Sequence, residues 1–200
     1  GLQANLSYLV NTGSFWEETD GAGQYSPVDF YAASKRAFQD FIAYYSKHSR
    51  LRSITIRPFG IFGPNDSRQN LFSYLDQHIN SSTPVKLTPG KQIFELIYLD
   101  DLLYAYHLAV EALQKTKAAT VLPSVEISTG EGLTLRKVIG LYEKTRASNM
   151  PIIWGGIPYR ENEVMDRYAN LRPAKQVLGW EPQTDIYTGF CRIYGKGEKL

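Results

Sequence analysis

Cysteine is scarce in this chain of 200 residues, because Cys191 is the single one. One thiol excludes an internal disulfide and fits a reducing compartment, so we expect a cytoplasmic protein. Long hydrophobic runs are missing as well. No uncharged apolar run approaches the roughly 18 residues that a membrane span needs, and no signal peptide is visible. We therefore expect no membrane partner.

The sequence also has no large excess of positive or negative charge, and it has no cluster of histidines. The formal net charge is +2 and the basic residues form no run, so we expect no nucleic-acid partner. No second histidine or cysteine stands at metal-ligand spacing from His107. His107 is therefore interpreted as a rim or packing residue, and we expect no metal. With 43% hydrophobic and 21% charged residues, the composition is that of a globular domain.

Short apolar strands alternate with longer amphipathic helices along the chain, which is typical of an α/β fold with a parallel sheet. The strands are expected at residues 6–10, 51–56, 84–87, 96–99, 125–128 and 151–154. Helices are expected at residues 31–47, 70–79, 135–145, 170–178 and 185–194, and another, capped by Asp100 and Asp101, runs to about residue 113. Loops are expected at residues 17–26 and in the Gly/Pro-rich run of residues 57–64.

The first strand, helix and strand have the spacing of a right-handed βαβ unit, and no long linker divides the chain. We therefore expect half of a doubly wound parallel sheet, built from residues 1–63 and 99–149. A smaller lobe is expected from residues 64–98 and 150–185.

The run Tyr31-Ala-Ala-Ser-Lys35 opens the first predicted helix, after an entrance marked by Pro27 and Asp29. Residues four apart share one helix face, so the phenol and the ammonium lie together. A positive charge so close favours the phenolate form, and such a phenol can exchange a proton with a carbinol or carbonyl oxygen. Because the chain has 14 tyrosines, the spacing also arises by chance, and alone it favours ordinary surface side chains.

Small polar residues follow the first predicted strand, in the run Asn11-Thr-Gly-Ser14. In open α/β sheets, ligands bind beyond the carboxyl ends of strands, so Thr12 and Ser14 would face a cleft. The other interpretation is a plain turn whose hydroxyls cap nearby backbone groups, and an isolated cluster favours it.

Several motifs occur together, in the order and at the spacing of one family. They are Asn11-Thr-Gly-Ser14, Tyr31-x-x-x-Lys35, Arg57-Pro-Phe-Gly-Ile-Phe-Gly-Pro64, Leu96-Ile-Tyr-Leu-Asp-Asp101 and Ile127-Ser-Thr-Gly130. Over nearly its whole length the chain thus resembles the extended short-chain dehydrogenase/reductase family, the nucleotide-sugar epimerases and dehydratases. The runs at residues 62–68, 154–156 and 158–163 look most like the reductases and epimerases of CDP-linked dideoxysugars.

The resemblance implies catalytic and cofactor roles. Tyr31 would be the catalytic acid/base, and Lys35 would assist it and hold the nicotinamide ribose of NAD or NADP. Thr12 would hydrogen-bond the reacting sugar oxygen, with Ser14 as the alternative. The backbone of Pro58, Phe59 and Gly60 would lie along the nicotinamide.

The resemblance also implies contacts to a nucleotide-diphosphate sugar. Asn70 and Leu71 match the segment at the diphosphate, and Leu87 lies in the edge strand along the base. Arg160 matches a diphosphate-binding arginine, whose fork suits phosphate oxygens. Gly60 stands where many members have asparagine, which bears on the substrate and not on the fold.

The family begins with a strand, a glycine-rich loop and a helix that cradle the pyrophosphate of NAD. Nothing in this sequence matches them, because Gly21-Ala-Gly23 lies in a polar loop before the Tyr31 helix. The chain therefore resembles the C-terminal two-thirds of such an enzyme, a Rossmann-like half with a C-terminal substrate-binding lobe. We expect this chain alone to bind NAD weakly or not at all.

The resemblance implies an enzyme that moves a hydride between NAD or NADP and a nucleotide-diphosphate sugar. It implies a reductase, an epimerase or a dehydratase, with a homodimer formed by a pair of helices. The alternative is a module on the same fold that binds a nucleotide or cofactor without turnover. A third interpretation is an inert fragment, stable only with its missing half or as an oligomer.

Overall fold

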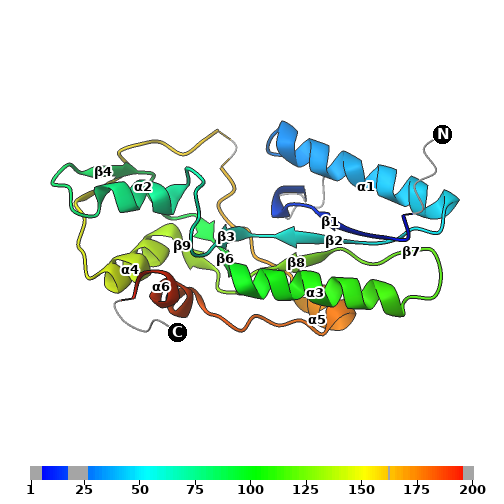
Figure 1. The fold of residues 1–200 in the computed structure, drawn as a ribbon. Coiled ribbons are helices and arrows are strands. Elements are labelled where there is room, and N and C mark those ends of the chain that lie inside the picture. The colour runs from blue at the N-terminus through cyan, green and yellow to red at the C-terminus, as the bar shows by residue number, and fades with distance from the viewer. Residues whose placement is uncertain (1–5, 18–26, 162, 196–200) are drawn as a thin grey trace.

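The molecule has two parts that lie next to each other along its long axis (Figure 1). The computed structural model describes residues 6–17, 27–161 and 163–195. One part is a parallel sheet with helices on both faces, and the other is a lobe of helices and short strands. This arrangement confirms the expected α/β class with a doubly wound parallel sheet.

The sheet is centred on β2 (Arg52–Pro58), which is buried along almost its whole length. β2 pairs in parallel with β1 (Tyr8–Thr12) on one side and with β7 (Thr120–Val121) and β8 (Val125–Ile127) on the other. Apolar and polar residues alternate along β2: Ile54 and Ile56 lie in the apolar core, while Ser53, Thr55 and Arg57 are buried polar residues. Because the strands are parallel, their carboxyl ends meet at one edge.

Helices cover both faces of the sheet (Figure 1). α1 (Phe30–His48) lies on one face, and its N-cap Asp29 accepts a hydrogen bond of 2.7 Å from the backbone N–H of Ala32, as expected from the sequence. α3 (Leu99–Lys115) and α5 (Arg172–Leu178) lie on the opposite face. Their apolar side chains and those of the sheet form one core, which contains Ile54, Ile56, Ile97, Leu102, Ala105, Ala109, Leu113, Val125, Ile127, Ala174, Leu178 and Trp180.

The start of α3 differs from the expectation, because Asp100 and Asp101 do not cap it. The N-cap residue is Tyr98, and its side chain makes no capping hydrogen bond. The buried Asp101 carboxylate instead accepts the backbone N–H groups of Gln183 and Thr184, both at 2.8 Å. The carbonyl of Asp101 accepts the indole N–H of the buried Trp180 at 3.0 Å. This residue therefore fastens the C-terminal segment to the sheet half.

The run of residues 57–64 is not the loop that we expected. β2 continues through Pro58, and β3 (Gly60–Phe62) follows after one residue and pairs in parallel with β6 (Leu96–Tyr98). The close packing requires a glycine at position 60, where a Cβ atom would lie 2.8 Å from Leu96 Cδ2. A Gly/Pro-rich run therefore forms strand here, because its backbone groups find a parallel partner.

The lobe is built around an aromatic core between α2 (Leu71–His78), α4 (Leu135–Arg146) and α6 (Ile186–Tyr194). Its buried members are Phe62, Phe72, Leu75, Val85, Leu87, Leu96, Tyr98, Leu135, Val138, Ile139, Tyr142, Met150, Ile186 and Phe190. The short elements β4 (Val85–Leu87) with β10 (Ile152–Trp154), β5 (Ile93–Phe94) with β9 (Leu133–Thr134), and the 3₁₀ turn η1 (Phe15–Glu17) complete the described structure.

One carboxylate joins the lobe helices to each other. Asp76 of α2 accepts the hydroxyl of Tyr142 of α4 at 2.6 Å and that of Tyr194 of α6 at 3.2 Å. Burial is the main cause that raises the pKa of both tyrosines. The phenols therefore keep their protons and continue to donate to Asp76.

Two helices pack in a different part of the molecule from the one that we expected from the sequence. α4 was expected in the sheet half, but its buried side chains belong to the core of the lobe. α5 was expected in the lobe, but Ala174 and Leu178 pack into the sheet core. The expected loop at residues 17–26 lies outside the described residues from residue 18 onward. Among the helices that the structure describes, none is long and apolar enough to cross a membrane.

We predict that Asp101→Asn lowers the free energy of unfolding by about 1–3 kcal/mol, because a neutral amide oxygen accepts the N–H groups of Gln183 and Thr184 more weakly than the carboxylate oxygen does. Urea unfolding monitored by tryptophan fluorescence measures this change. Asp100→Asn, at the neighbouring exposed position, is the control and should stay within about 0.5 kcal/mol of the wild type. Equal stability of the two variants would contradict the role of Asp101.

Candidate active site

The first turns of α1 bring Tyr31 and Lys35 to the carboxyl end of β1. The Lys35 Nζ lies 5.5 Å from the centre of the Tyr31 ring, and it donates a hydrogen bond of 2.9 Å to the backbone carbonyl of Thr12. Tyr31 is 51% exposed, so its phenol is accessible. The structure therefore brings the three predicted catalytic residues to one place.

The hydroxyl of Thr12 does not point to α1. It lies 2.6 Å from the hydroxyl of Tyr106, which belongs to α3 on the opposite face of the sheet. The preceding Asn11 has the other orientation, since its amide donates to Thr55 at 3.2 Å, and Thr55 donates at 2.9 Å to Gln39 of α1. Thr12 is thus held by α1 through its carbonyl and by α3 through its hydroxyl.

Ser14 is 4% exposed, and its hydroxyl accepts the backbone N–H of Trp16 at 3.3 Å. Its own N–H donates to the Glu17 carboxylate at 2.7 Å. These contacts are those of the plain turn that was the other interpretation of this cluster. The hydroxyl of Ser14 is therefore less accessible to a ligand than that of the exposed Thr12.

Glu17 is fully buried between the Thr12 turn, α1 and β2. It accepts a hydrogen bond of 3.1 Å from the amide of Gln39 and forms an ion pair of 3.4 Å with Arg57. Gln39 stands one helical turn after Lys35, so this contact fixes the part of α1 that carries the ammonium. Sequence reasoning missed this group. An arginine near the end of an apolar strand is the signal that indicates a buried partner.

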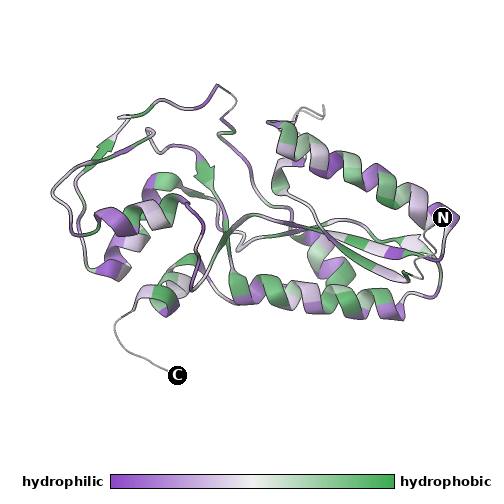
Figure 2. Cartoon of the chain, turned by 45° about the horizontal axis from the view of Figure 1, so that its top comes forward, coloured by the Kyte–Doolittle hydropathy of each residue, from purple (hydrophilic) through white to green (hydrophobic). Residues whose placement is uncertain are grey.

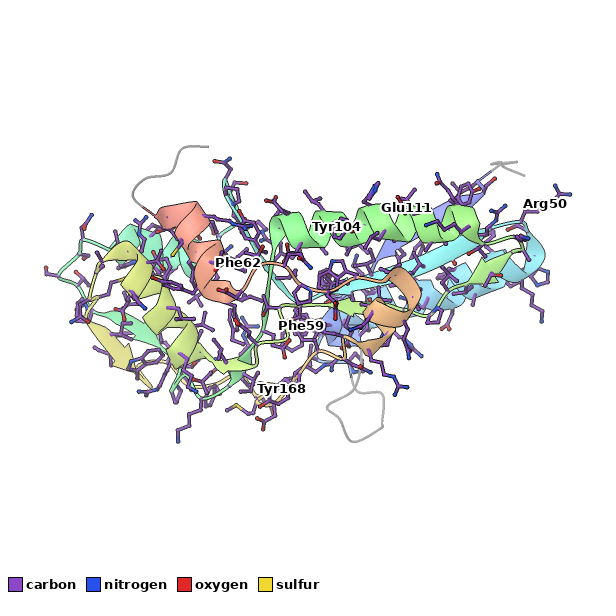
Figure 3. The ribbon with its side chains drawn as sticks, turned by 90° about the horizontal axis from the view of Figure 1, so that it is seen from below. Arg50, Phe59, Phe62, Tyr104, Glu111 and Tyr168 are labelled. Atoms are coloured by element: carbon purple, nitrogen blue, oxygen red, sulfur yellow. The ribbon has the colours of Figure 1, made fainter. Side chains whose placement is uncertain are left out.

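The segment Pro58-Phe59-Gly60 lies at the junction of the two parts, where Figure 3 labels Phe59. The Phe59 ring stacks on Phe15 with a centroid distance of 4.6 Å, and the Arg167 guanidinium lies 5.5 Å from its centre. Phe59 and Gly60 line a small cavity of about 100 Å³. This backbone segment thus lies at the strand ends, between the sheet and the lobe.

A larger cleft of about 590 Å³ adjoins it, and Trp16 lines both cavities. The cleft brings together Leu71, Leu87 and Arg160, which come from separate elements of the lobe. The other lining residues are Trp16, Val28, Asp29, Thr88, Gln92, Phe94, Leu135, Ile157, Pro158, Glu161, Glu163 and Val164. Val28 and Asp29 precede α1, so the cleft reaches from the lobe to the start of the Tyr31 helix.

Asn70 differs from the other predicted substrate residues, because its side chain is engaged within the protein. It is the N-cap of α2 and accepts the backbone N–H of Ser73 at 3.0 Å. Its amide donates to Asp66 at 2.7 Å. Asn70 lines a separate cavity of about 280 Å³ that Gly60 and Leu71 also border. It therefore adjoins the cleft without lining it.

A second group of buried charges stands at the small cavity and was also missed. Glu126 is paired with Arg167 and accepts the backbone N–H of Asn170 at 2.6 Å. Glu95 accepts the hydroxyl of Ser128 at 2.5 Å and the N–H of Ala169. Burial is the main cause that raises the pKa of Glu95, with the charge of Glu126 adding to it. The sequence signal was a single carboxylate within an apolar run, Glu126 inside β8 and Glu95 between β5 and β6.

In the part of the chain that the structure describes, no three acidic, histidine or cysteine side chains gather as metal ligands would.

A parallel sheet with helices on both faces, together with a Tyr-x-x-x-Lys helix at its strand ends, defines a Rossmann-type fold of the short-chain dehydrogenase/reductase kind. The chain belongs to the NAD dependent epimerase/dehydratase family, which matches residues 10–122. This family is the one that the sequence motifs resemble.

Curated relatives include two kinds of nucleotide-sugar enzyme. CDP-abequose synthase of Salmonella typhimurium is 28% identical over 191 residues, which cover 94% of this chain and 62% of the relative. UDP-glucose 4-epimerase of Rhizobium leguminosarum bv. trifolii is 27% identical, over 80% of this chain and 53% of the relative. The chain thus spans less than two-thirds of the length of the relatives that it matches.

Solved structures share the fold. MoeE5 in complex with UDP-glucuronic acid and NAD has a TM-score of 0.80 at 19% identity, covering 96% of this chain and 65% of that one. UDP-glucose-4-epimerase from Stenotrophomonas maltophila, with bound NAD and formylated UDP-arabinopyranose, has a TM-score of 0.79 at 19% identity, over 94% of this chain and 62% of that one. At this identity the comparison shows the fold.

We predict that Glu95→Gln changes how stability depends on pH. Because the folded-state pKa of Glu95 is raised above its ordinary value of 4.5, its contribution to stability is fully present below that value and is lost as the pH rises through the raised pKa. Glutamine does not titrate. The wild type should therefore lose stability relative to the variant as the pH rises above about 4.5.

Urea unfolding of both proteins at a series of pH values measures this difference. A difference that stays constant over the whole range would show that the raised pKa of Glu95 is wrong.

Proposed function

We propose that the protein containing this chain is an NAD- or NADP-dependent oxidoreductase or epimerase that acts on a nucleotide-diphosphate sugar. One observation carries the proposal: the Tyr31–Lys35 pair lies at the Thr12 strand end, and the cleft that begins beside α1 leads to Arg160. The cleft is lined by Arg160, which can bind an anion, and by Val28 and Asp29, which directly precede the helix that carries Tyr31. Family membership supports the same chemistry.

The residues at the strand ends fit the nicotinamide end of the cofactor. Lys35 carries ammonium donors that suit ribose hydroxyls, and the segment from Pro58 to Gly60 presents backbone next to a small cavity. A glycine at position 60 leaves this backbone open to close approach. When bound, the cofactor supplies hydride transfer to or from the sugar carbon.

The side chains of the chain supply proton transfer and orientation. Tyr31 donates a proton to the sugar oxygen when the keto carbon is reduced and accepts it in the reverse direction. Lys35 stabilises the phenolate by its charge. Thr12 donates a hydrogen bond to the same oxygen while negative charge develops on it. In an epimerase these residues act twice, once on either face of the sugar.

The lobe supplies the nucleotide site. Arg160 is exposed at the cleft, where its guanidinium can bind two oxygens of a diphosphate. Leu71 and Leu87 offer apolar surface for the nucleoside, and Leu87 ends the edge strand β4. The names of the relatives refer to CDP- and UDP-linked sugars, which support this substrate class.

A binding module on the same fold is the second candidate, and one observation favours it. The large cleft is lined by Arg160 and Leu87 but by none of Thr12, Tyr31 and Lys35. Such a protein would bind a nucleotide or cofactor in the same cleft and leave it unchanged.

We also propose a cytoplasmic homodimer. The single cysteine suits a reducing compartment. Hydrophobic residues recur along α1 (Figure 2), and its face away from the sheet exposes a stripe that includes Phe30, at 87%, with Phe38, Phe41 and Tyr45. These positions follow helical spacing, so they form one continuous surface. A second copy of the same helix would cover it.

We predict that Tyr31→Phe lowers kcat by about 100- to 10 000-fold, because the variant has no acid/base for the sugar oxygen. Binding of the nucleotide sugar, measured by calorimetry, should be retained. The test uses the longest natural form of the protein that contains this chain. Tyr44→Phe, at an exposed position of the same helix, is the control and should keep full activity.

Undiminished turnover by Tyr31→Phe would refute the assignment of the acid/base. If the wild type binds the nucleotide sugar tightly without any turnover, the binding module becomes the better proposal.

We predict that Phe41→Glu weakens self-association by about tenfold or more, since a charge at the centre of an apolar interface is costly. Sedimentation velocity over a range of concentrations measures the association constant. Lys47→Glu changes a charge on the flank of the same helix and should leave it nearly unchanged. A wild type that is monomeric at every concentration would exclude the dimer.

A further inference from the structure

We propose that Tyr106 is a positioning residue: its phenol donates a hydrogen bond to Thr12 Oγ1 and so directs the proton of the Thr12 hydroxyl toward the sugar oxygen. The inference rests on the proposed function and adds to it a residue of α3, a helix that the Tyr31 motif does not include. Tyr106 itself would not touch the substrate.

The contact joins two hydroxyl groups at 2.6 Å, a normal length for an O–H···O hydrogen bond. Each hydroxyl has one proton and two lone pairs, so one group donates and the other accepts. If Tyr106 donates, the proton of Thr12 remains for a second acceptor. Thr12 is exposed at the end of β1, so this proton can reach a ligand that lies over the strand ends.

The surroundings of Tyr106 favour donation from the phenol. Its ring packs against the core of the sheet half, which holds it in place. A phenol is a stronger acid than an aliphatic alcohol, so the Tyr106 hydroxyl is the better hydrogen-bond donor of the two. Thr12 is then the acceptor, and its exposed hydroxyl keeps its own proton for a ligand.

The two sides of Thr12 are thus held by helices on opposite faces of the sheet. Lys35 of α1 binds the carbonyl at 2.9 Å, and Tyr106 of α3 binds the hydroxyl. A threonine has few staggered χ1 states, and one hydrogen bond selects among them. The orientation of the proposed oxygen-binding hydroxyl is therefore set before the substrate arrives, which is the condition for efficient stabilisation of a developing charge.

The decisive experiment removes one hydroxyl at a time from the longest natural form of the protein. Tyr106→Phe keeps the ring and should lower kcat about tenfold with little change in KM, because orientation matters most when charge develops on the oxygen. Tyr104→Phe is the matched control, because this tyrosine lies two residues away on α3 and is 48% exposed (Figure 3). It should keep the wild-type kcat.

A double-mutant cycle separates positioning from a merely structural role. Thr12→Val removes the hydroxyl at almost constant shape and should lower kcat further than Tyr106→Phe does. In the Thr12→Val background, Tyr106→Phe should have no additional effect, since the group on which it acts is gone. Thr12→Ser should restore the dependence on Tyr106. Independent, multiplicative losses in the double variant would overturn the proposal.

A second readout does not depend on turnover. The hydrogen bond from Thr12 to the phenolate lowers the pKa of Tyr106, in opposition to burial. Thr12→Val should therefore move the titration of Tyr106, followed by NMR of its labelled Cζ carbon, to higher pH. An unchanged titration would show that the two hydroxyls are not bonded in solution, which would also overturn the proposal.

The outcomes distinguish this inference from the function on which it rests. If Tyr31→Phe abolishes turnover while Tyr106→Phe keeps the wild-type kcat, the positioning role fails and the proposed function stands. If Tyr31→Phe leaves turnover intact, the proposed function fails whatever Tyr106 does.

Discussion

The candidate site depends on the contacts that the buried carboxylate of Glu17 makes. It holds the turn after β1 through the N–H of Ser14, α1 through Gln39 and β2 through Arg57. Because a buried charge without partners is costly, these elements are held in one arrangement that satisfies it. Lys35 lies one turn before Gln39, and its contact with the carbonyl at the end of β1 follows from that arrangement.

The buried charges of the molecule lie where its parts meet. Glu17 stands between the sheet and α1, Asp101 between α3 and the C-terminal segment, and Glu95 beside the junction with the lobe. Apolar packing supplies most of the stability but allows neighbouring surfaces to slide, because it has little directional preference. Hydrogen bonds to buried carboxylates supply that direction. The site thus lies between elements whose relative positions are fixed by polar contacts.

Much of this arrangement could be predicted from the sequence. The first parallel strand pair, the N-cap of α1 and the Tyr31–Lys35 pair follow from short-range patterns, which local propensity and spacing determine. The strand at Gly60–Phe62 was missed because its partner is more than thirty residues away. The partners of Thr12 and Asp101 were missed for the same reason, since only the fold brings α3 to the end of β1 and to the C-terminal segment. Buried charges in apolar strands were the one long-range signal that the sequence did contain.

The short strand pair β3–β6 sends alternate side chains into different cores, with Ile97 in that of the sheet and Leu96 and Tyr98 in that of the lobe. A movement of these strands that disturbs the core of the sheet half would therefore also disturb the core of the lobe. A molecule in the cleft that contacts both Tyr31 and Arg160 would span the same junction. Its binding would then make the link between the two parts more rigid. The loss of conformational entropy would weaken the affinity for the ligand, so this affinity would depend on the link as well as on direct contacts.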